Sequence, residues 1–496
     1  MPNSYVLGID QSTQGTKALL LDSAGQLLDK ETLPHRQIID EQGYVEHDLD
    51  EIYANTCAVV GKLLARHPDK EATLRCVGLS VQRETVSAWQ RSTLKPIYHA
   101  IVWQCPRGAA FTSTPQVQAM APRVRKITGL ELSEFFSAAK ITWLADHVPA
   151  FAQLAAAHDL CVGNMDTFLI HKLTHGKTFA TEPSNASRTQ LMDIHTVSWS
   201  PELCSLFKVP QDALPPILDS DSNFGETDFE GLLPHPIPIH AAIGDSQGAL
   251  FGQGCLQKGQ TKTTYGTGSS IMMCAGAEVP QPEHGVVTSA AWRRQGQMTY
   301  VLEGNINYSA GIISYLKDDL KLISDPGETA ALAQAAHPQD KTFFIPAFSG
   351  LGAPYFNGKV RGALLGMSRV TGRNEIVRAA LDSIAYQVTD VLNLIGKSAG
   401  AQVTDLRVDG GATRNPYLMQ MQADLAGTTI KVPRDAELSG MGAAFMAGIA
   451  CGVYDTAVLL QDRTAAIFKP AQNDSWRQEH LTAWHQAVQC ALSYQA

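Results

Sequence analysis

The chain has 496 residues, of which 44% are hydrophobic and 18% charged, and a formal net charge of −9 at neutral pH. This composition excludes a disordered chain. The surplus of acidic residues argues against a protein that binds the phosphate backbone of nucleic acids, which needs a basic surface. No run approaches the ~18 apolar residues that span a membrane, and the opening MPNSYVLGID lacks the pattern of a secretory signal. We therefore expect a cytoplasmic globular protein with no nucleic-acid or membrane partner.

The first part of the chain alternates between β-rich and helical segments. YVLGID and KALLLD are β-rich runs on either side of the small polar segment QSTQGT, which predicts a β-hairpin over residues 5–22. Residues 50–66 carry apolar side chains at helical spacing, and CVGLSVQ at 76–82 is typical of a buried strand. This alternation predicts an α/β fold with ligands bound at the ends of the strands.

A second round of the same pattern begins near residue 240. HAAIGDSQGALFG predicts a strand, a turn and a helix, and KTTYGTGSSIMMCAG predicts a second hairpin that loosely resembles the first. We interpret the two hairpins as a sign of a duplicated architecture. The expected domains are residues 1–250 and residues 251–496.

The remaining elements are mostly helical. The periodicity of residues 374–396 predicts a long helix that Asn374 caps at its start and Gly396 at its end. LRVDGGATRNPYL predicts a strand, a Gly-Gly turn and a helix start. MGAAFMAGIACGV predicts a buried helix, and the C-terminal segment an amphipathic packing helix.

Three polar turns can hold a nucleotide. Asp10 ends the first predicted strand, and the turn after it offers backbone N–H groups, hydroxyls and a lysine, so Asp10 can act on phosphates through Mg²⁺. In TYGTGSS, Gly266 allows close backbone approach and Thr267 supplies a hydroxyl. In VDGGATRN, two glycines can lie against a purine whose edge a later asparagine can bind. Taken alone, the first turn is more typical of an ordinary polar hairpin. The second is also compatible with a plain hairpin, and Gly-Gly turns like the third are common.

Four further residues suit an acceptor with hydroxyl groups. Arg83 and Glu84 stand together at a strand end, where a guanidinium and a carboxylate can bind a vicinal diol. Trp103 offers an apolar face, and Asp245 can take the proton of an attacking hydroxyl. The alternatives are a solvated turn for the charged pair, a core position for Trp103 and a helix cap for Asp245.

Together the motifs resemble those of the FGGY carbohydrate kinases, and within that family they are most similar to those of the glycerol kinases. The resemblance covers nearly the whole chain, in the expected order and spacing. The motifs that carry it are LGIDQSTQGTKALLLD, GYVEHD, VQRETVSAW, AIVWQ, FFSAAKITWL, SNASRTQL, IGDSQGALFGQ, TYGTGSS, PAFSGLGAPYF, RGALLGMSR, LDSIAYQVTDVL, RVDGGATRNPYLMQMQADLAGT and GMGAAFMAG.

The resemblance implies two actin/Hsp70-like (ribonuclease H-like) ATPase domains about a cleft, with ATP on the C-terminal side and the acceptor on the N-terminal side. It implies Mg²⁺-dependent transfer of the γ-phosphoryl group to a primary hydroxyl, in a homo-oligomer. Asp245 matches the general base and Asp10 the metal-associated aspartate. The residues that match, or stand at, its nucleotide-binding positions are Thr13, Gln14, Lys17, Gly266, Thr267, Gly410, Gly411 and Asn415. Those in its acceptor pocket are Arg83, Glu84, Trp103, Phe135, Asp245, Ser246 and Ser270.

Several of these positions depart from the glycerol kinase pattern. Phe135 replaces a glycerol-binding tyrosine, Ser246 a glutamine and Ser270 an aromatic residue that closes the pocket. Cys105 replaces an aspartate, and in the first turn Gln14 and Lys17 replace a threonine and an arginine. Smaller side chains at 246 and 270 enlarge the pocket, so we expect a four- to six-carbon polyol or ketose as acceptor, with glycerol as the alternative.

Two other classes of function share the expected fold. An actin/Hsp70-like nucleotide-dependent switch would have no use for an acceptor pocket made by Arg83, Glu84, Trp103 and Asp245. A pseudokinase that binds sugar without phosphorylating it would not need both Asp10 and Asp245. The residues therefore favour a kinase.

Overall fold

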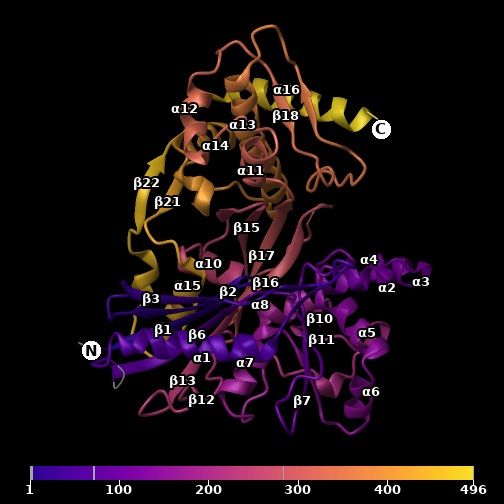
Figure 1. The fold of residues 1–496 in the computed structure, drawn as a ribbon, viewed down its shortest axis with the longest axis vertical. Helices are drawn as coiled ribbons and strands as arrows, with labels where there is room; N and C mark the ends of the chain where they lie inside the picture. The colour runs from indigo at the N-terminus through magenta and orange to yellow at the C-terminus, as the bar shows by residue number, and fades with distance from the viewer. Residues whose placement is uncertain (1–3, 71–72, 283, 495–496) are drawn as a thin grey trace.

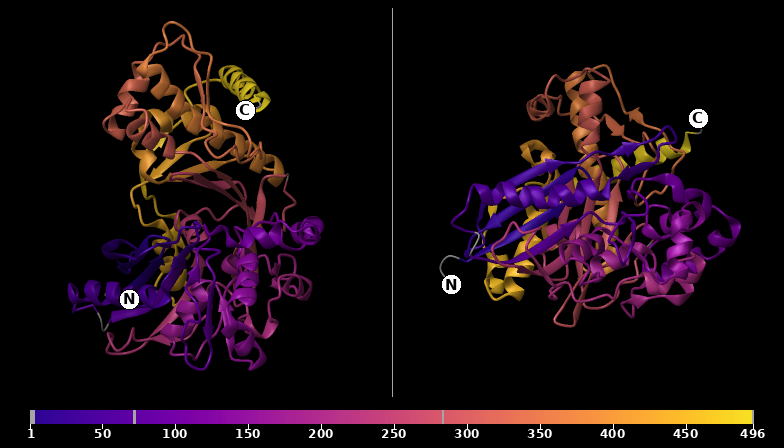
Figure 2. Two further views of the ribbon diagram at one scale, coloured as in Figure 1. Left: turned by 45° about the vertical axis from the view of Figure 1, so that its right-hand side comes forward. Right: turned by 60° about the horizontal axis from the view of Figure 1, so that its bottom comes forward.

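The computed structural model describes residues 4–70, 73–282 and 284–494. Two halves built around two β-sheets lie end to end along the longest axis (Figures 1 and 2). The N-terminal half forms the lower part of Figure 1, and most of the C-terminal half forms the upper part.

The N-terminal sheet has six strands in the order β12-β13-β6-β1-β2-β3. β1 pairs with β2 as the expected antiparallel hairpin, and β1, β6 and β13 run parallel to one another. The strands are β1 Tyr5–Gln11, β2 Gly15–Leu21, β3 Leu27–Pro34, β6 Leu74–Val81, β12 Glu226–Thr227 and β13 Ile237–Gly244.

The C-terminal sheet has seven strands in the order β16-β17-β15-β14-β20-β21-β22. β14 forms a hairpin with β15 and lies parallel to β20, as β1 does with β2 and β6. This equivalence confirms the duplicated architecture. The strands are β14 Gln260–Tyr265, β15 Ser269–Gly276, β16 Val287–Arg294, β17 Gln297–Ile306, β20 Asp405–Asp409, β21 Ile430–Pro433 and β22 Thr464–Phe468.

Alternation of side chains along the strands gives the N-terminal sheet two buried faces. Leu7 and Ile9 pack with α1 (Leu49–Ala65) and α7 (Met165–Leu173) on one face. Val6 and its neighbours on the other face pack with α10 (Asp245–Gly252) and α15 (Leu438–Ala450). The same cluster includes residues of β15, β16 and β17, so one apolar core joins the two halves.

α15 belongs to the C-terminal part of the sequence but lies against the N-terminal sheet, as its gold ribbon shows in Figure 1. Glycines allow this close packing. A Cβ on Gly78 of β6 would lie 2.1 Å from the carbonyl oxygen of Ala443, and one on Gly442 would lie 1.9 Å from that of Gly248. The expected buried helix is therefore confirmed, and its glycines let it contact β6 and α10 at backbone distance.

The helices of the upper half cover the outer face of the second sheet. α13 (Arg373–Ala399) lies on β15 and β17, with α14 (Pro416–Ala426) beside it. α16 (Asp474–Ser493) packs through Trp484, whose ring stacks on Tyr386 of α13 at 5.0 Å. The predicted caps of α13 are wrong, because Gly372 and Gly400 flank the helix and Asn374 and Gly396 lie inside it.

Smaller elements complete the fold. In the N-terminal half they are β4 Ile38–Ile39, β5 Val45–His47, β7 Ser87–Gln90, β8 Ala100–Ile101, α2 Ala109–Thr112, α3 Pro115–Ala119, α4 Ala121–Thr128, α5 Ser137–His147, α6 Pro149–Ala156, β9 Leu160–Gly163, α8 Pro183–Ala186, β10 Met192–Asp193, β11 Ser198–Trp199 and α9 Pro201–Leu206. In the C-terminal half they are α11 Gly311–Asp318, α12 Thr329–Gln334, β18 Phe343–Ile345 and β19 Ala363–Leu365. In the described segments, no helix is both long and apolar enough to cross a membrane.

We predict that Gly442→Ala lowers the urea midpoint of unfolding, because its methyl group would overlap the backbone of Gly248. Overpacking of this kind costs about 1–3 kcal/mol. Gly358→Ala is the matched control, since a Cβ at Gly358 has no atom within 4 Å. Equal midpoints for the two variants would contradict the proposed packing of α15.

Candidate active site

Three parallel strands end side by side and bring the predicted catalytic residues together. Asp10 of β1 is in register with Ser80 of β6, and Ser80 is in register with Ile243 of β13. The segment after β6 carries Arg83, and Asp245 follows β13 directly. Because the carboxyl ends of parallel strands share one edge, side chains far apart in the sequence become neighbours.

Asp10 is a buried carboxylate at this edge. Ser80 donates a hydrogen bond from Oγ to Asp10 Oδ1 at 2.8 Å, and Lys17 Nζ lies 4.0 Å from Oδ2. Burial raises the pKa of Asp10 to about 6, against the opposing charge of Lys17, and the charge of Asp245 also raises it. Asp245 is thus close enough to Asp10 for its charge to act on the pKa of Asp10.

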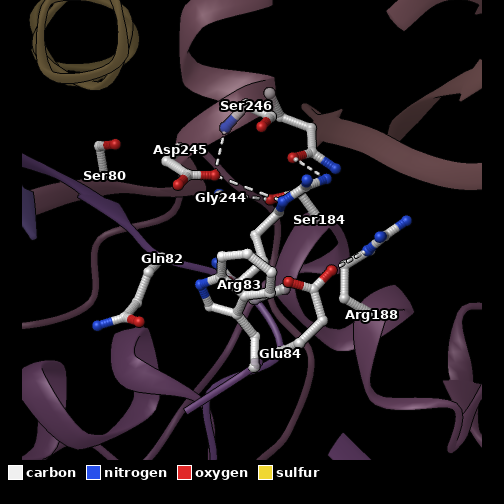
Figure 3. A network of polar contacts seen from close by, with 12 residues as sticks. Ser80, Gln82, Arg83, Glu84, Ser184, Arg188, Gly244, Asp245 and Ser246 are labelled. Atoms are coloured by element: carbon white, nitrogen blue, oxygen red, sulfur yellow. Dashed lines mark hydrogen bonds and ion pairs between the residues drawn. The ribbon is translucent and has the colours of Figure 1, made fainter. Parts of the chain in front are cut away.

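Asp245 is the first residue of α10, and Gly244 occupies the cap position. Asp245 Oδ1 accepts a hydrogen bond from the N–H of Ser246 at 2.6 Å, so one carboxylate oxygen is engaged at the start of the helix. The side chain is 33% exposed. Arg83 Nε lies 3.4 Å from Asp245 Oδ1, and the N–H of Gly244 donates to Ser184 Oγ at 2.8 Å (Figure 3). The backbone before Asp245 is held in place while its carboxylate stays partly open, which suits a group that accepts a proton.

Behind Asp245 lies a buried network of four charges. Arg83 NH1 and NH2 donate to the two carboxylate oxygens of Glu303 at 3.0 and 3.1 Å. Arg188 NH1 donates to Glu303 at 3.1 Å and to Ser289 Oγ at 2.9 Å, and Arg188 Nε contacts Glu84. Burial alone would raise the pKa of Glu303, but Arg188 and Arg83 hold it well below its usual range.

This network joins the halves of the chain. Arg83, Glu84 and Arg188 belong to the N-terminal half, and Glu303 comes from β17 of the C-terminal sheet. Glu84 adopts a left-handed backbone (φ 60°), a strained conformation of a kind that clusters at functional sites. The predicted neighbours Arg83 and Glu84 are thus fixed by partners that the sequence analysis did not identify.

The sequence contains features that could have pointed to Glu303 and Arg188. Glu303 is a carboxylate inside the apolar run YVLEGNI, and acidic residues are rarely buried without a partner. Arg188 lies in SNASRTQL, which contributed to the family resemblance without being assigned a role.

Two aromatic residues, Trp103 and Phe135, lie beside the turn of the β1–β2 hairpin. Trp103 Nε1 donates to Thr13 Oγ1 at 2.9 Å, and the Trp103 ring meets Phe135 edge to face at 5.4 Å. Trp103 is half-buried and packs against the edge of an apolar core cluster, so its position fits both the proposed pocket and the alternative of a core residue. Because Thr13 accepts this bond, its own hydroxyl proton remains free to donate.

A cavity of about 660 Å³ lies in the C-terminal half. Gly266 and Thr267 of the β14–β15 turn line it together with Gly411 and Asn415, so two separate predicted segments meet there. Its remaining wall comes from the start of α11 and from residues 325–330, which the sequence analysis missed. The volume is typical of a pocket for a small ligand or cofactor.

Asn415 and Gly410, both predicted to bind the nucleotide, make close contacts within the chain. The side-chain amide of Asn415 is already hydrogen-bonded within the chain. Its Oδ1 accepts from the backbone N–H of Leu418 at 3.0 Å, and its Nδ2 donates to Thr329 Oγ1 at 2.9 Å. Gly410 (φ 97°) is outside the cavity lining, and a Cβ there would lie 2.2 Å from the Tyr265 carbonyl oxygen.

The hairpin residues Gln14 and Lys17 lie in the other half of the chain. Gln14 is exposed at the tip of the β1–β2 turn. Lys17 Nζ pairs with Glu437 Oε2 at 2.6 Å, so part of its charge is already balanced within the chain.

We predict that Glu303→Gln lowers turnover and destabilises the protein by about 3–5 kcal/mol, because it leaves Arg83 and Arg188 without their shared buried anion. Glu131→Gln is the control, since Glu131 is 36% exposed and pairs with Arg125 at 3.1 Å. Exposed pairs contribute about 1 kcal/mol or less. Unfolding and steady-state kinetics would check both variants, and equal losses would refute a special role for Glu303.

Comparison with known proteins follows the same division of the chain. The N-terminal domain of the FGGY family of carbohydrate kinases matches residues 5–252, and its C-terminal domain matches residues 261–451. Glycerol kinase 1 of Thermotoga maritima is 39% identical over 99% of this chain and 100% of its own length. The glycerol kinase of Desulfitobacterium hafniense is 37% identical over 98% of both chains.

Comparison with solved structures also finds kinases that superpose on this chain. Plasmodium falciparum glycerol kinase with ADP superposes with a TM-score of 0.94 at 34% identity over 99% of both chains. A ligand-bound xylulose kinase from Lactobacillus acidophilus shares the fold, with a TM-score of 0.87 at 17% identity over 99% of both chains. These matches confirm the expected actin/Hsp70-like fold and an ATP-dependent kinase that uses Mg²⁺ to phosphorylate a small sugar or polyol. The chain belongs to the FGGY family of carbohydrate kinases.

Proposed function

We propose that this kinase transfers the γ-phosphoryl group of ATP to a primary hydroxyl of a four- to six-carbon polyol or ketose, with Asp245 as general base. The observation that carries the proposal is the position of Asp245. Its carboxylate is partly open at the strand edge, beside Arg83 and close enough to Asp10 to raise the pKa of that group. Phosphoryl transfer depends mainly on such positioning and on charge neutralisation.

The nucleotide is proposed to occupy the cavity lined by Gly266, Thr267 and Gly411. Asp10 fits the role of a Mg²⁺ ligand. Its Oδ2 atom receives no hydrogen bond in the described part of the chain, and Lys17 is 4.0 Å away. Proteins commonly hold Mg²⁺ through one or two carboxylates and the substrate phosphates, and the ion neutralises phosphate charge. Among the described residues there is no cluster of three or more candidate metal ligands, which agrees with that mode.

Two observations favour different acceptors. The glycerol kinases of Thermotoga maritima and Desulfitobacterium hafniense match 99% and 98% of the chain, which favours glycerol. The acceptor pocket favours a longer substrate, because Phe135, Ser246 and Ser270 stand where the glycerol kinase pattern has a tyrosine, a glutamine and an aromatic residue. Overall identity reflects mainly the fold, whereas acceptor choice depends on a few contacts. The pocket residues therefore bear on acceptor choice more directly than overall identity does.

We predict that a panel of C3 to C6 polyols and ketoses will give the highest kcat/KM with a four- to six-carbon compound. The assay is ADP release coupled to each acceptor. Glycerol giving by far the highest value would contradict the longer acceptor and leave the kinase activity intact. ADP release that needs no acceptor would favour a nucleotide-dependent switch.

We also predict that Asp245→Asn lowers kcat at least ~10²-fold, since it removes the proton acceptor. ATP affinity, measured by calorimetry, should stay near the wild-type value because the proposed nucleotide cavity does not include Asp245. Asp50→Asn, at an exposed position in the first turn of α1, is the control. Near-normal turnover of Asp245→Asn would show that another group is the base.

A further inference from the structure

A polar pair of residues lies on the face of the C-terminal sheet that meets Arg83. Ser270 of β15 is directly opposite Asn305 of β17, and the next pair on the same face is Met272 opposite Glu303. Glu303 uses both carboxylate oxygens to bind Arg83, so this face of the two strands is turned toward the acceptor-side residues.

The hydrogen-bonding capacity of this pair is largely unused. Ser270 Oγ is buried and has no hydrogen-bond partner among the residues that the structure describes. Asn305 is exposed, and its side chain makes one long contact, from Nδ2 to Glu303 Oε1 at 3.5 Å. A buried hydroxyl without a partner is destabilising, so a bound group that satisfies it gains affinity.

A chain of polar contacts connects Asn305 to the proposed base. Asn305 contacts Glu303, Glu303 pairs with Arg83 at 3.0 Å, and Arg83 Nε is 3.4 Å from Asp245. One guanidinium and one carboxylate therefore separate the amide of Asn305 from the carboxylate of Asp245. An acceptor whose reacting hydroxyl lies on Asp245 would reach Asn305 only with a more distant part of its carbon chain.

We propose that Asn305, supported by Ser270, binds a hydroxyl of the acceptor remote from the phosphorylated one and thereby selects acceptors longer than glycerol. An amide and a hydroxyl can both donate and accept, as an alcohol does, which suits a neutral polyol or ketose. The charges of Glu303 and Arg83 already balance each other, so a charged sugar acid or amine would find no counter-ion in them. This inference rests on the proposed function.

The test is Asn305→Ala, assayed with the best four- to six-carbon acceptor and with glycerol. Loss of one hydrogen bond should lower kcat/KM for the longer acceptor roughly three- to tenfold, which corresponds to about 0.65–1.4 kcal/mol. The value for glycerol should stay within about twofold of wild type, which also shows that the variant folds. Asn393→Ala, at an exposed position of α13, is the matched control and should change neither value.

An equal fall in kcat/KM for both acceptors would show a general structural role for Asn305 and overturn the inference. An unchanged kcat/KM for both acceptors would also overturn it. Calorimetric titration of the longer acceptor gives a second readout that does not need turnover. Equal affinities of wild type and Asn305→Ala would also overturn the inference. Failure of the proposed function differs from all of these, since wild type would then release no acceptor-dependent ADP with any compound of the panel.

Discussion

The parallel pairing of β1, β6 and β13 decides where chemistry can take place in this protein. The register sets Asp10 and Ile243 on either side of Ser80, so the carboxylates of Asp10 and Asp245 emerge at one edge of the sheet. The environments of the two aspartates differ. Asp10 is buried, with its pKa raised to about 6, and Asp245 is partly open to solvent. Two like groups can serve different roles when their surroundings differ in this way.

The second constraint is the buried charge network that spans the two halves. Buried ion pairs are poor sources of net stability, because removing two charges from water is costly. What the network provides is geometry, since Glu303 of the C-terminal sheet fixes Arg83 and Arg188 of the N-terminal half. The return of α15 to the N-terminal sheet connects the halves a second time. The proposed acceptor side of the site is therefore assembled from both halves.

Local sequence patterns predicted the elements well. The two hairpins, the helix near residue 50 and the helix at 438–450 followed from alternation, periodicity and small residues, which act over a few positions. The caps of α13 were wrong because competing residues nearby can cap a helix. Glu375 Oε2 accepts from the N–H of Gly372 at 2.8 Å, and the left-handed Gly400 ends the helix four residues after Gly396.

The contacts between distant segments could not be predicted from such local patterns. Glu303 meets Arg83 across 220 residues, and residues 325–330 reach the cavity through the packing of α11 and α12. Such contacts depend on how the sheets and helices pack, and single-sequence periodicity carries no information about them. Residue patterns and the family resemblance supplied the proposed position of the site, whereas the partners that hold its charged residues came from the structure.

The most direct test of this account is a crystal structure with a non-hydrolysable ATP analogue and the best acceptor bound together. The account predicts an acceptor hydroxyl oxygen about 2.6–3.2 Å from the carboxylate of Asp245. It also predicts the nucleotide in the cavity lined by Gly266 and Gly411, with its terminal phosphate directed toward that hydroxyl. An acceptor bound away from Asp245, or a nucleotide outside that cavity, would contradict it.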